Sequence, residues 1–571
     1  MVFSTSFGFA LLRRRLRSAA AAATVAAFAL TTPSQANAAE AMKSDYFAAA
    51  RSIDLLGEVY REVTENYVDP VDVSELMFSG IDGMLDKLDP YTAFLDESET
   101  QELDELTTGQ YAGIGITIGL VSGDLYITSV IDGNAASNAG LRIGDRIVLI
   151  NGSRVSKRPV DEVRTAIKGP VGSTVRLGVT RSGWRGVRDY LLTRAEVRVS
   201  SVSFSGLFGS VGYVEMDSFG ERSTEELRTA VRSLQSQAVS NNGTLQGLVL
   251  DLRGNPGGLL LAAVDVSGIF LDKGSKVVST IGRRADSGQV YVTRTAPLVP
   301  SLPLAVLIDG DSASASEIVA GAIQEHDRGV IVGDVSFGKG LVQSIVNLPY
   351  DHVLKLTTSK YYTPSGRLIQ KPLARTEGAR KVIPGAGAYD STKVFYTAHR
   401  RKVFGGGGIR PDVVIRAPEP SAYEHALDRK GMFFKYANRY RAGHERVSEQ
   451  DLSSGALLGE FNRFVESEHF TFRSKSRQTL DSLKVLIGKE YGRDGDALSP
   501  RLGELEKELS VRAARGLAGD SLRIASAVRR ELLRHYDEKA ARRRAVSEDP
   551  VAAKAIALLS DPKAYRALLR P

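Results

Sequence analysis

The chain has 571 residues, of which 43% are hydrophobic and 25% charged, and its formal net charge is +7 at pH 7. At roughly 150 residues per domain, this length and composition predict an ordinary globular protein of about three or four folding units and argue against a fibrous or disordered one. The absence of cysteine excludes disulfides, thiolate metal sites, a cysteine nucleophile and a lipoprotein anchor, and it is compatible with an oxidising compartment.

Residues 1–38 have the pattern of a secretory signal peptide. Four arginines precede an apolar run at 19–30, and the small-residue site Ala36-Asn37-Ala38 follows. We therefore expect export to the periplasm or the exterior, with cleavage after Ala38. An uncleaved signal that tethers the protein to the membrane is the alternative, although the run is shorter than the roughly 20 residues that span a bilayer. Because no acidic residue precedes Glu40, removal of the four arginines lowers the net charge from +7 to +3, which argues against nucleic acid as a partner.

The mature chain begins with a predicted helical N-terminal segment, residues 44–108. Its apolar side chains recur at helical spacing, and Asp69-Pro70 and Asp89-Pro90 interrupt the pattern. From 109 to 196 the pattern changes to short β-type runs around one predicted helix at 160–167. A segment of this size and pattern predicts a small mixed domain.

Residues 200–418 form the largest predicted unit. Continuous apolar runs, expected to be strands at 211–216, 248–252, 304–308 and 330–332, alternate with helical patterns. Strands that are buried under helices on both faces have this composition, so we expect an α/β core.

Residues 421–571 are predicted to be almost entirely helical. An apolar stripe follows a helix cap expected at Asp520-Ser521, and arginines cluster at 542–544. We interpret this region as solvated helical surface. One alternative is a dimerisation or partner-docking surface, through which the protein would form a homo-oligomer, and another is attraction to an anionic membrane surface.

Three serines, Ser312, Ser314 and Ser316, occupy a turn between a buried strand and a helix that starts near Ala315. At a helix N-terminus, unpaired N–H groups and the helix dipole favour developing negative charge, so a nucleophile and an oxyanion site would coincide there. Taken alone, serines in this position are more often caps and turn residues.

Lys339 lies among glycines and apolar residues in the segment 336–343. A lysine takes the proton of a serine only if burial or a nearby cation lowers its pKa, and this setting suits a buried amine. For any single lysine, a surface position in a turn is the default interpretation. His326 and His352 also fall within the core, but neither has a convincing aspartate partner, so a Ser-His-Asp triad is a minor alternative.

A second anion-binding element precedes the serines at 250–259, where a strand ends in Gly257-Gly258. Paired glycines let backbone N–H groups approach a ligand closely, as an oxyanion hole requires. The same glycines would also suit a tight turn. Any one of these three elements could occur by chance, but the glycine pair, the serine turn and the lysine are much less expected to occur together by chance.

Three motifs in chain order produce a specific resemblance. They are Asp-Leu-Arg-Gly-Asn-Pro-Gly-Gly at 251–258, Ser-Ala-Ser-Ala-Ser-Glu-Ile-Val-Ala-Gly at 312–321 and Val-Gly-Asp-x-Ser-Phe-Gly-Lys-Gly-x-Val-Gln at 332–343. With Leu-Asp-Pro-Tyr-Thr at 88–92, they resemble the carboxyl-terminal processing peptidases, or tail-specific proteases, which are S41-family serine proteases. The resemblance spans about residues 55–418 and implies a multidomain α/β protein, in which a PDZ domain is inserted beside a ClpP/crotonase-like protease core.

The resemblance implies a role for each residue of the site. The family's catalytic serine lies 25 positions before its lysine, which selects Ser314 as the nucleophile and Lys339 as the general base. Gln343, four positions after the lysine, would orient the base. Backbone N–H groups of Ala315 and of Gly257 or Gly258 would stabilise the oxyanion, and the sequence leaves the choice between the glycines open.

The small domain contains a segment, residues 111–118, that resembles the carboxylate-binding loop of a PDZ domain. The expected peptide-binding residues are Gly113, Ile114, Gly115 and Ile116. Loop N–H groups of this kind hold a terminal carboxylate while the peptide extends a sheet edge. The expected partners are therefore protein substrates with exposed, apolar C-terminal tails.

The expected function is that of a secreted or periplasmic serine endopeptidase that uses a Ser-Lys dyad. No metal and no organic cofactor is implied. Two alternatives are a PDZ-containing binding protein without catalysis and a crotonase-like acyl-CoA enzyme, since a Gly-Gly oxyanion loop also suits thioesters. Both the serine and the lysine are present, which disfavours the first, and export with a PDZ-like segment disfavours the second.

Overall fold

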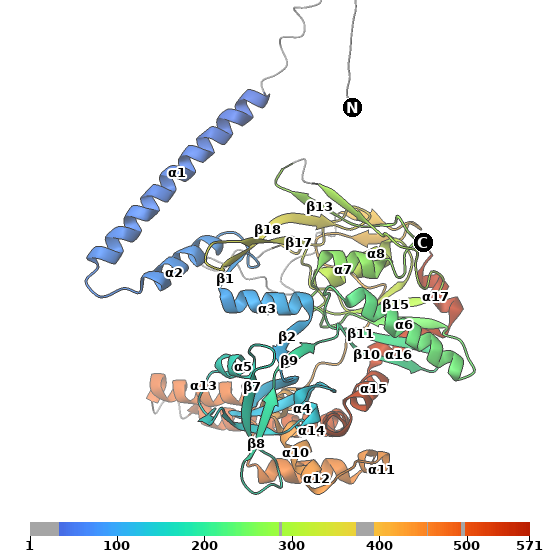
Figure 1. Ribbon diagram of the computed structural model, residues 1–571. Helices are drawn as coiled ribbons and strands as arrows, with labels where there is room; N and C mark the ends of the chain where they lie inside the picture. The colour runs from blue at the N-terminus through green and yellow to red at the C-terminus, as the bar shows by residue number, and fades with distance from the viewer. Residues whose placement is uncertain (1–33, 285–287, 373–392, 454, 493–496, 571) are drawn as a thin grey trace, which may run out of the picture. The chain divides into compact units, whose positions relative to one another are not determined.

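A computed structural model describes residues 34–284, 288–372, 393–453, 455–492 and 497–570 (Figure 1). The chain divides into two compact units, residues 1–85 and 86–571. Most of the predicted signal peptide, residues 1–33, lies outside the described residues, and helix α1 (Ser34–Asn66) includes the expected cleavage site.

The first unit consists of α1 and α2 (Val73–Leu85). The two helices are separated at the predicted break, where Pro70 lacks a backbone donor and disfavours helix at Asp69. The hydroxyl of Tyr60 donates to the carbonyl oxygen of Val73 at 2.8 Å and so connects the two helices.

The second unit begins with β1 (Ala93–Leu95) and α3 (Glu97–Thr108) and continues into the small domain. The small domain's sheet has the order β3 (Ile116–Val121), β4 (Asp124–Val130), β5 (Arg146–Ile150), β7 (Thr174–Thr180), β8 (Arg188–Thr193), with β6 (Ser153–Arg154) beside β5. The short α4 (Ala135–Asn138) and α5 (Val160–Ile167) complete it, and α5 packs against β3 and β5. Because β3 is the first strand in this order, it is an edge of the sheet. Separately, β2 (Gln110–Gly113) pairs with β9 (Ala195–Arg198) where the chain enters and leaves the domain.

The central sheet of the large domain has the order β10 (Val202–Phe208), β11 (Val211–Met216), β12 (Gly247–Asp251), β15 (Leu304–Ile308), β16 (Val330–Gly333), β21 (Val413–Val414). All neighbours are parallel except β10 and β11. The four strands β11, β12, β15 and β16 lie within one residue of the predicted ranges.

Both faces of this sheet are covered, which explains the continuous apolar runs. One face packs against α6 (Ser223–Ser240), α7 (Leu260–Ser267) and α8 (Ala315–Glu325) through residues such as Leu250 and Val306. The other face, with Val249 and Leu307, packs against the C-terminal helix α16 (Pro550–Leu559) (Figure 1).

A second sheet lies beside the serine turn and has the order β1, β18 (Val353–Tyr362), β13 (Lys276–Gly282), β14 (Gln289–Val292), with β17 (Leu341–Asn347) on β18. The antiparallel register of β17 and β18 places Gln343 opposite Thr357. A hairpin of β19 (Val394–Tyr396) and β20 (Lys402–Phe404) follows.

The C-terminal region is helical, as predicted, and its helices are α9 (Ala422–Arg429), α10 (Met432–Gly443), α11 (Glu449–Ser453), α12 (Ala456–Ser467), α13 (Lys475–Tyr491), α14 (Ser499–Tyr536), α15 (Glu538–Glu548), α16 and α17 (Pro562–Leu568). Phe433 of α10 stacks on Phe461 of α12 at 5.2 Å between ring centroids, in a core that includes Leu532 of α14. The predicted helix start at Asp520-Ser521 is wrong, because α14 runs through both residues. Within the described parts of the chain, no helix is both long and apolar enough to cross a membrane.

Candidate active site

Ser314 occupies the N-cap of α8, in the turn that follows β15. Its φ of +53° lies in the left-handed region, which is strained for a residue with a side chain. Gly257 lies directly against it: a Cβ at Gly257 would come within 2.8 Å of the Ser314 Cβ. The strained turn and the close glycine together place the Ser314 hydroxyl beside the N-terminus of α8.

The structure distinguishes the three serines of this turn. The hydroxyl of Ser312 donates to the carbonyl oxygen of Leu252 at 2.8 Å, and that of Ser316 donates to the carbonyl oxygen of Asn255 at 2.9 Å. Both side chains are fully buried. Ser314 Oγ belongs to the capping box of α8, in which it faces the backbone N–H of Glu317, and its hydroxyl donates to no residue that the structure describes. Ser314 is therefore the serine of this turn whose proton is not engaged.

Lys339 lies in the segment between β16 and β17, with its ammonium 4.5 Å from the ring centroid of Tyr91. Burial, aided by the positive charge of Lys355, lowers the pKa of Lys339 to about 8, although Asp89 and Glu317 oppose the shift. A buried amine with this pKa is partly neutral near neutral pH, as a general base must be. Among the described contacts no hydrogen bond joins the Lys339 amine to the Ser314 hydroxyl, so the structure brings together the backbones of these residues and leaves their side chains unbonded.

Glu317, in the first turn of α8, connects the two backbones. Its Oε2 accepts hydrogen bonds from the N–H groups of Ser314 and Lys339, at 2.9 Å each. Its Oε1 accepts from Gly338 N at 2.7 Å and from the Ser336 hydroxyl at 2.5 Å. Burial raises the pKa of this fully buried carboxyl to about 7, against the four hydrogen bonds that favour the ionised form.

The hydroxyl of Tyr361 makes a second connection between the same two segments. It lies 3.2 Å from the carbonyl oxygen of Ser314 and also contacts the carbonyl oxygen of Lys339. Neither Glu317 nor Tyr361 is among the site residues predicted from the sequence. A glutamate three residues after a serine at a helix start is the capping-box pattern, and this signal points to Glu317.

Gln343 is linked to the turn at residues 88–92. Its Nε2 donates to Thr357 Oγ1 at 3.3 Å, and that hydroxyl donates to Asp89 Oδ1 at 3.2 Å. The same Asp89 oxygen accepts from Tyr91 N at 2.8 Å, which fixes the turn that presents the Tyr91 ring to Lys339. Gln343 makes no described hydrogen bond to Lys339 itself, so its connection to the amine runs through this turn.

The segment 251–258, which we call the glycine strap, lies beside Ser314. Gly257 N donates to Asn255 Oδ1 at 2.9 Å, so this N–H is occupied. In the described part of the chain, the N–H groups of Gly258 and Ala315 have no acceptor. Gly258, with φ of +147°, has no room for a side chain, because a Cβ there would lie 2.2 Å from the carbonyl oxygen of Phe219. Of the two glycines, Gly258 therefore has the N–H that is free to bind an oxyanion.

The expected peptide-binding loop, residues 113–116, leads into the edge strand β3. The carbonyl oxygens of Ile114 and Gly115 accept hydrogen bonds from Ala136 and Ile131, at 3.0 and 2.9 Å. Their own N–H groups have no partner among the described residues. The loop thus has free donors beside a free sheet edge, which is the arrangement that captures a C-terminal tail.

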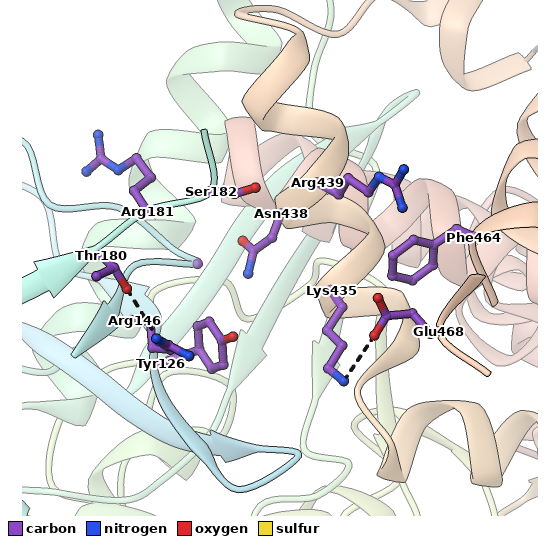
Figure 2. A pocket seen from close by; sticks show the side chains of 11 residues that line it. Tyr126, Arg146, Thr180, Arg181, Ser182, Lys435, Asn438, Arg439, Phe464 and Glu468 are labelled. Carbon is purple, nitrogen blue, oxygen red and sulfur yellow. Dashed lines mark hydrogen bonds and ion pairs between the residues drawn. The ribbon is translucent and has the colours of Figure 1, made fainter. Parts of the chain in front are cut away.

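The small domain packs against the C-terminal helices. Tyr126 meets Phe434 of α10 edge to face at 5.3 Å, and the Ser122 hydroxyl donates to the carbonyl oxygen of Lys430 at 2.9 Å. A cavity of about 420 Å³ lies at this interface. Figure 2 shows some of the side chains that line it, among them Arg146 and Lys435. None of the predicted catalytic residues lines this cavity. Within the described residues, no cluster of three His, Cys, Asp or Glu side chains is arranged to hold a metal ion.

Family models match most of the chain. The model described as "Peptidase family S41" matches residues 210–377, and "PDZ domain" matches residues 104–180. "Activating protease CtpB N-terminal domain" matches residues 18–100, and "Probable PDZ-protease, C-terminal helical domain" matches residues 423–559.

Curated relatives and a solved structure carry related descriptions. The carboxy-terminal-processing protease of Bartonella bacilliformis is 34% identical over 368 residues, which are 64% of this chain and 76% of that protein. The carboxy-terminal processing protease CtpB of Bacillus subtilis is 33% identical over 325 residues, 56% of this chain and 66% of that protein. The solved photosystem II D1 C-terminal processing protease is 26% identical over 63% of this chain and 92% of that chain, with a TM-score of 0.33.

The family models and the curated relatives define a protease that combines a PDZ domain with flanking helical regions. The chain belongs to peptidase family S41, together with the carboxy-terminal processing proteases. The predicted family and fold class are thereby confirmed, and the two alternative functions are not favoured. The domain boundaries and the site residues given above remain predictions.

Proposed function

We propose that this protein is an exported serine endopeptidase that cleaves protein substrates selected by their C-terminal tails, with Ser314 and Lys339 as its catalytic dyad. The observation that carries the proposal is the combination, around the N-terminus of α8, of the Ser314 hydroxyl, the free N–H groups of Gly258 and Ala315, and the segment of Lys339, whose pKa is lowered to about 8. The signal pattern of residues 1–38 supports export to the periplasm or the exterior.

In the proposed mechanism, the neutral amine of Lys339 takes the proton of the Ser314 hydroxyl as the oxygen attacks the scissile carbonyl. The N–H groups of Gly258 and Ala315 stabilise the oxyanion. The ammonium of Lys339 then gives the proton to the leaving amine, and water releases the acyl group from Ser314 by the reverse sequence. Gln343 supports the lysine through Thr357 and the Asp89 turn, and no metal or organic cofactor takes part.

Tail recognition is assigned to the PDZ domain. A terminal carboxylate would accept hydrogen bonds from the loop at 113–116 while the tail pairs with the edge of β3. The domain would also gate the protease site until a tail binds. The gate is disproved if removal of residues 111–196 leaves tail-dependent cleavage unchanged.

The test compares wild type, Ser314→Ala and Lys339→Ala on unfolded proteins that differ only in their last few residues. Ser301→Ala and Lys273→Ala, at exposed positions, serve as matched controls. We expect both site variants to lose about 10³-fold or more in kcat/KM and both controls to cleave like wild type. Cleavage that survives both site substitutions would overturn the assignment.

A further inference from the structure

Arg253 anchors the glycine strap, and one of its partners comes from the far end of the chain. Its Nε and Nη2 donate to the Asp251 carboxylate, at 2.9 and 2.6 Å for the closest pairs. Its Nη2 also donates to the Tyr213 hydroxyl at 3.3 Å. The remaining nitrogen, Nη1, binds Asp549 Oδ2 at 2.5 Å. Three groups therefore determine the position of this guanidinium, and only Asp549 lies outside the protease core.

Asp549 is the N-cap of α16 and uses both of its carboxylate oxygens. Oδ1 accepts from Val551 N at 2.7 Å, while Oδ2 binds Arg253. The Arg253 and Asp549 side chains are each only 20% exposed, so this charge-assisted pair is stronger than an ordinary surface ion pair. Because α16 packs on β12 and β15, the carboxylate is held by a rigid element.

The strap is connected in turn to the serine turn. Its Asn255 carbonyl oxygen accepts from Ala313 N at 3.0 Å and from the Ser316 hydroxyl at 2.9 Å. A displacement of Arg253 would therefore move the strap against the turn that carries Ser314. Since Gly258 lies in the same strap, its free N–H would move away from the position of the oxyanion.

We propose that Asp549 is a positioning residue of the protease site: through Arg253 it fixes the glycine strap so that the Gly258 N–H meets the developing oxyanion. The C-terminal helical region is then part of the catalytic framework as well as the support of the PDZ domain. This inference rests on the proposed function, because it needs hydrolysis through an oxyanion at this site.

The chain contains a matched control for the test. Asp561 also precedes a proline and caps a helix, α17, where its Oδ1 accepts from Lys563 N at 3.0 Å and Ala564 N at 3.1 Å. Asp561 makes no ion pair with any described residue. Asparagine caps helices about as well as aspartate, so Asp549→Asn and Asp561→Asn both keep a cap, while only Asp549→Asn removes the charge that binds Arg253.

We expect Asp549→Asn to lower kcat roughly 10- to 100-fold, because a displaced oxyanion donor costs transition-state stabilisation, with KM changed less than about threefold. Asp561→Asn should match wild type, and Asp549→Glu should recover part of the loss. In an Arg253→Gln background, Asp549→Asn should have little further effect, since coupled residues are not additive. Equal kcat values for Asp549→Asn and Asp561→Asn would overturn the proposal.

A second readout does not depend on activity. Amide hydrogen exchange of strap residues 252–258 should be faster in Asp549→Asn than in Asp561→Asn, with exchange in β12 and α8 unchanged. Equal exchange of the strap in the two variants would also contradict the proposal. Cleavage by Ser314→Ala is measured in parallel. If Ser314→Ala still cleaves, the proposed function fails. If only Asp549→Asn behaves like its control, this inference alone fails.

Discussion

Oε2 of Glu317 accepts a hydrogen bond from the backbone N–H of Lys339 at 2.9 Å, and the same oxygen accepts one from Ser314 N at 2.9 Å. One buried carboxylate thus joins the segment of the proposed nucleophile to the segment of the proposed base. Since the Ser314 and Lys339 side chains share no described hydrogen bond, their alignment depends on this backbone connection.

Replacing Glu317 with glutamine should impair both stability and activity. Three of the four groups that face Glu317 are backbone N–H donors, so a side-chain NH₂ in place of one oxygen leaves at least one buried N–H without an acceptor. We expect a loss of about 1–3 kcal/mol in the free energy of unfolding, measured by urea denaturation, and a fall in kcat of more than tenfold. Glu225→Gln, at an exposed position of α6, should change stability by less than about 0.5 kcal/mol. A Glu317→Gln enzyme with wild-type kcat would show that the connection is dispensable.

The proposed base predicts the pH dependence of cleavage. Lys339 must be neutral, and its pKa is about 8, so kcat/KM should rise about tenfold per pH unit below 8 and level off above it. Glu317, with a pKa of about 7, becomes protonated below that pH, which steepens the fall in the same direction.

A substitution at Lys355 distinguishes the titration of Lys339 from that of other groups. The positive charge of Lys355 helps to lower the Lys339 pKa, so Lys355→Gln should shift the midpoint of the profile to higher pH. Lys360→Gln, at an exposed position of the same strand, should leave the midpoint in place. A profile that is unchanged in Lys355→Gln would argue against Lys339 as the titrating base.

Lys339→Met should make the inactive protein more stable. The folded-state pKa of about 8 lies below the ordinary value of 10.5, so below pH 8 the folded protein bears the full cost of the buried charge, and the cost shrinks between pH 8 and 10.5. At pH 7 the gain should be at most about 3 kcal/mol, reduced by loss of the contact with the Tyr91 ring. Urea denaturation at pH 7 and pH 9.5 measures it, and a gain that does not shrink at the higher pH would contradict this explanation.

The PDZ domain should recognise substrate tails through their free C-terminal carboxylate. Amidation of the C-terminus removes the negative charge that the loop N–H groups bind, so KM should rise about tenfold or more while kcat changes little. Gly115→Ala should reduce the difference, because a Cβ there would lie 2.4 Å from the Asn134 Cβ and distort the loop. Equal KM values for free and amidated tails in the wild type would exclude carboxylate recognition.

The regular parts of the fold were predictable from the sequence. The strands β11, β12, β15 and β16 are buried on both faces, and burial of this kind leaves a continuous apolar run that identifies each strand. The helix start expected at Asp520 was wrong because packing against α10 and α12 continues α14 through a residue that would otherwise favour a cap.

For the candidate site, the sequence leads only to the residues that belong to a local pattern. Ser314 and Lys339 belong to short motifs, but the choice of Gly258 over Gly257 depends on the Asn255 side chain, whose orientation no sequence pattern specifies. The ion pair of Arg253 with Asp549 joins residues that are far apart in the sequence of the second unit. Contacts of this kind are created by tertiary packing and have no periodicity to reveal them.

The role of Ser314 as the nucleophile can be tested directly. Wild-type enzyme is mixed with a slowly hydrolysed ester substrate, the reaction is quenched with acid, and the acylated residue is located by peptide mapping and mass spectrometry. If Ser314 is the nucleophile, the acyl group will be found on Ser314 and not on Ser312 or Ser316, and Ser314→Ala will not be acylated. Acylation of a different residue, or cleavage by Ser314→Ala at the wild-type rate, would contradict it.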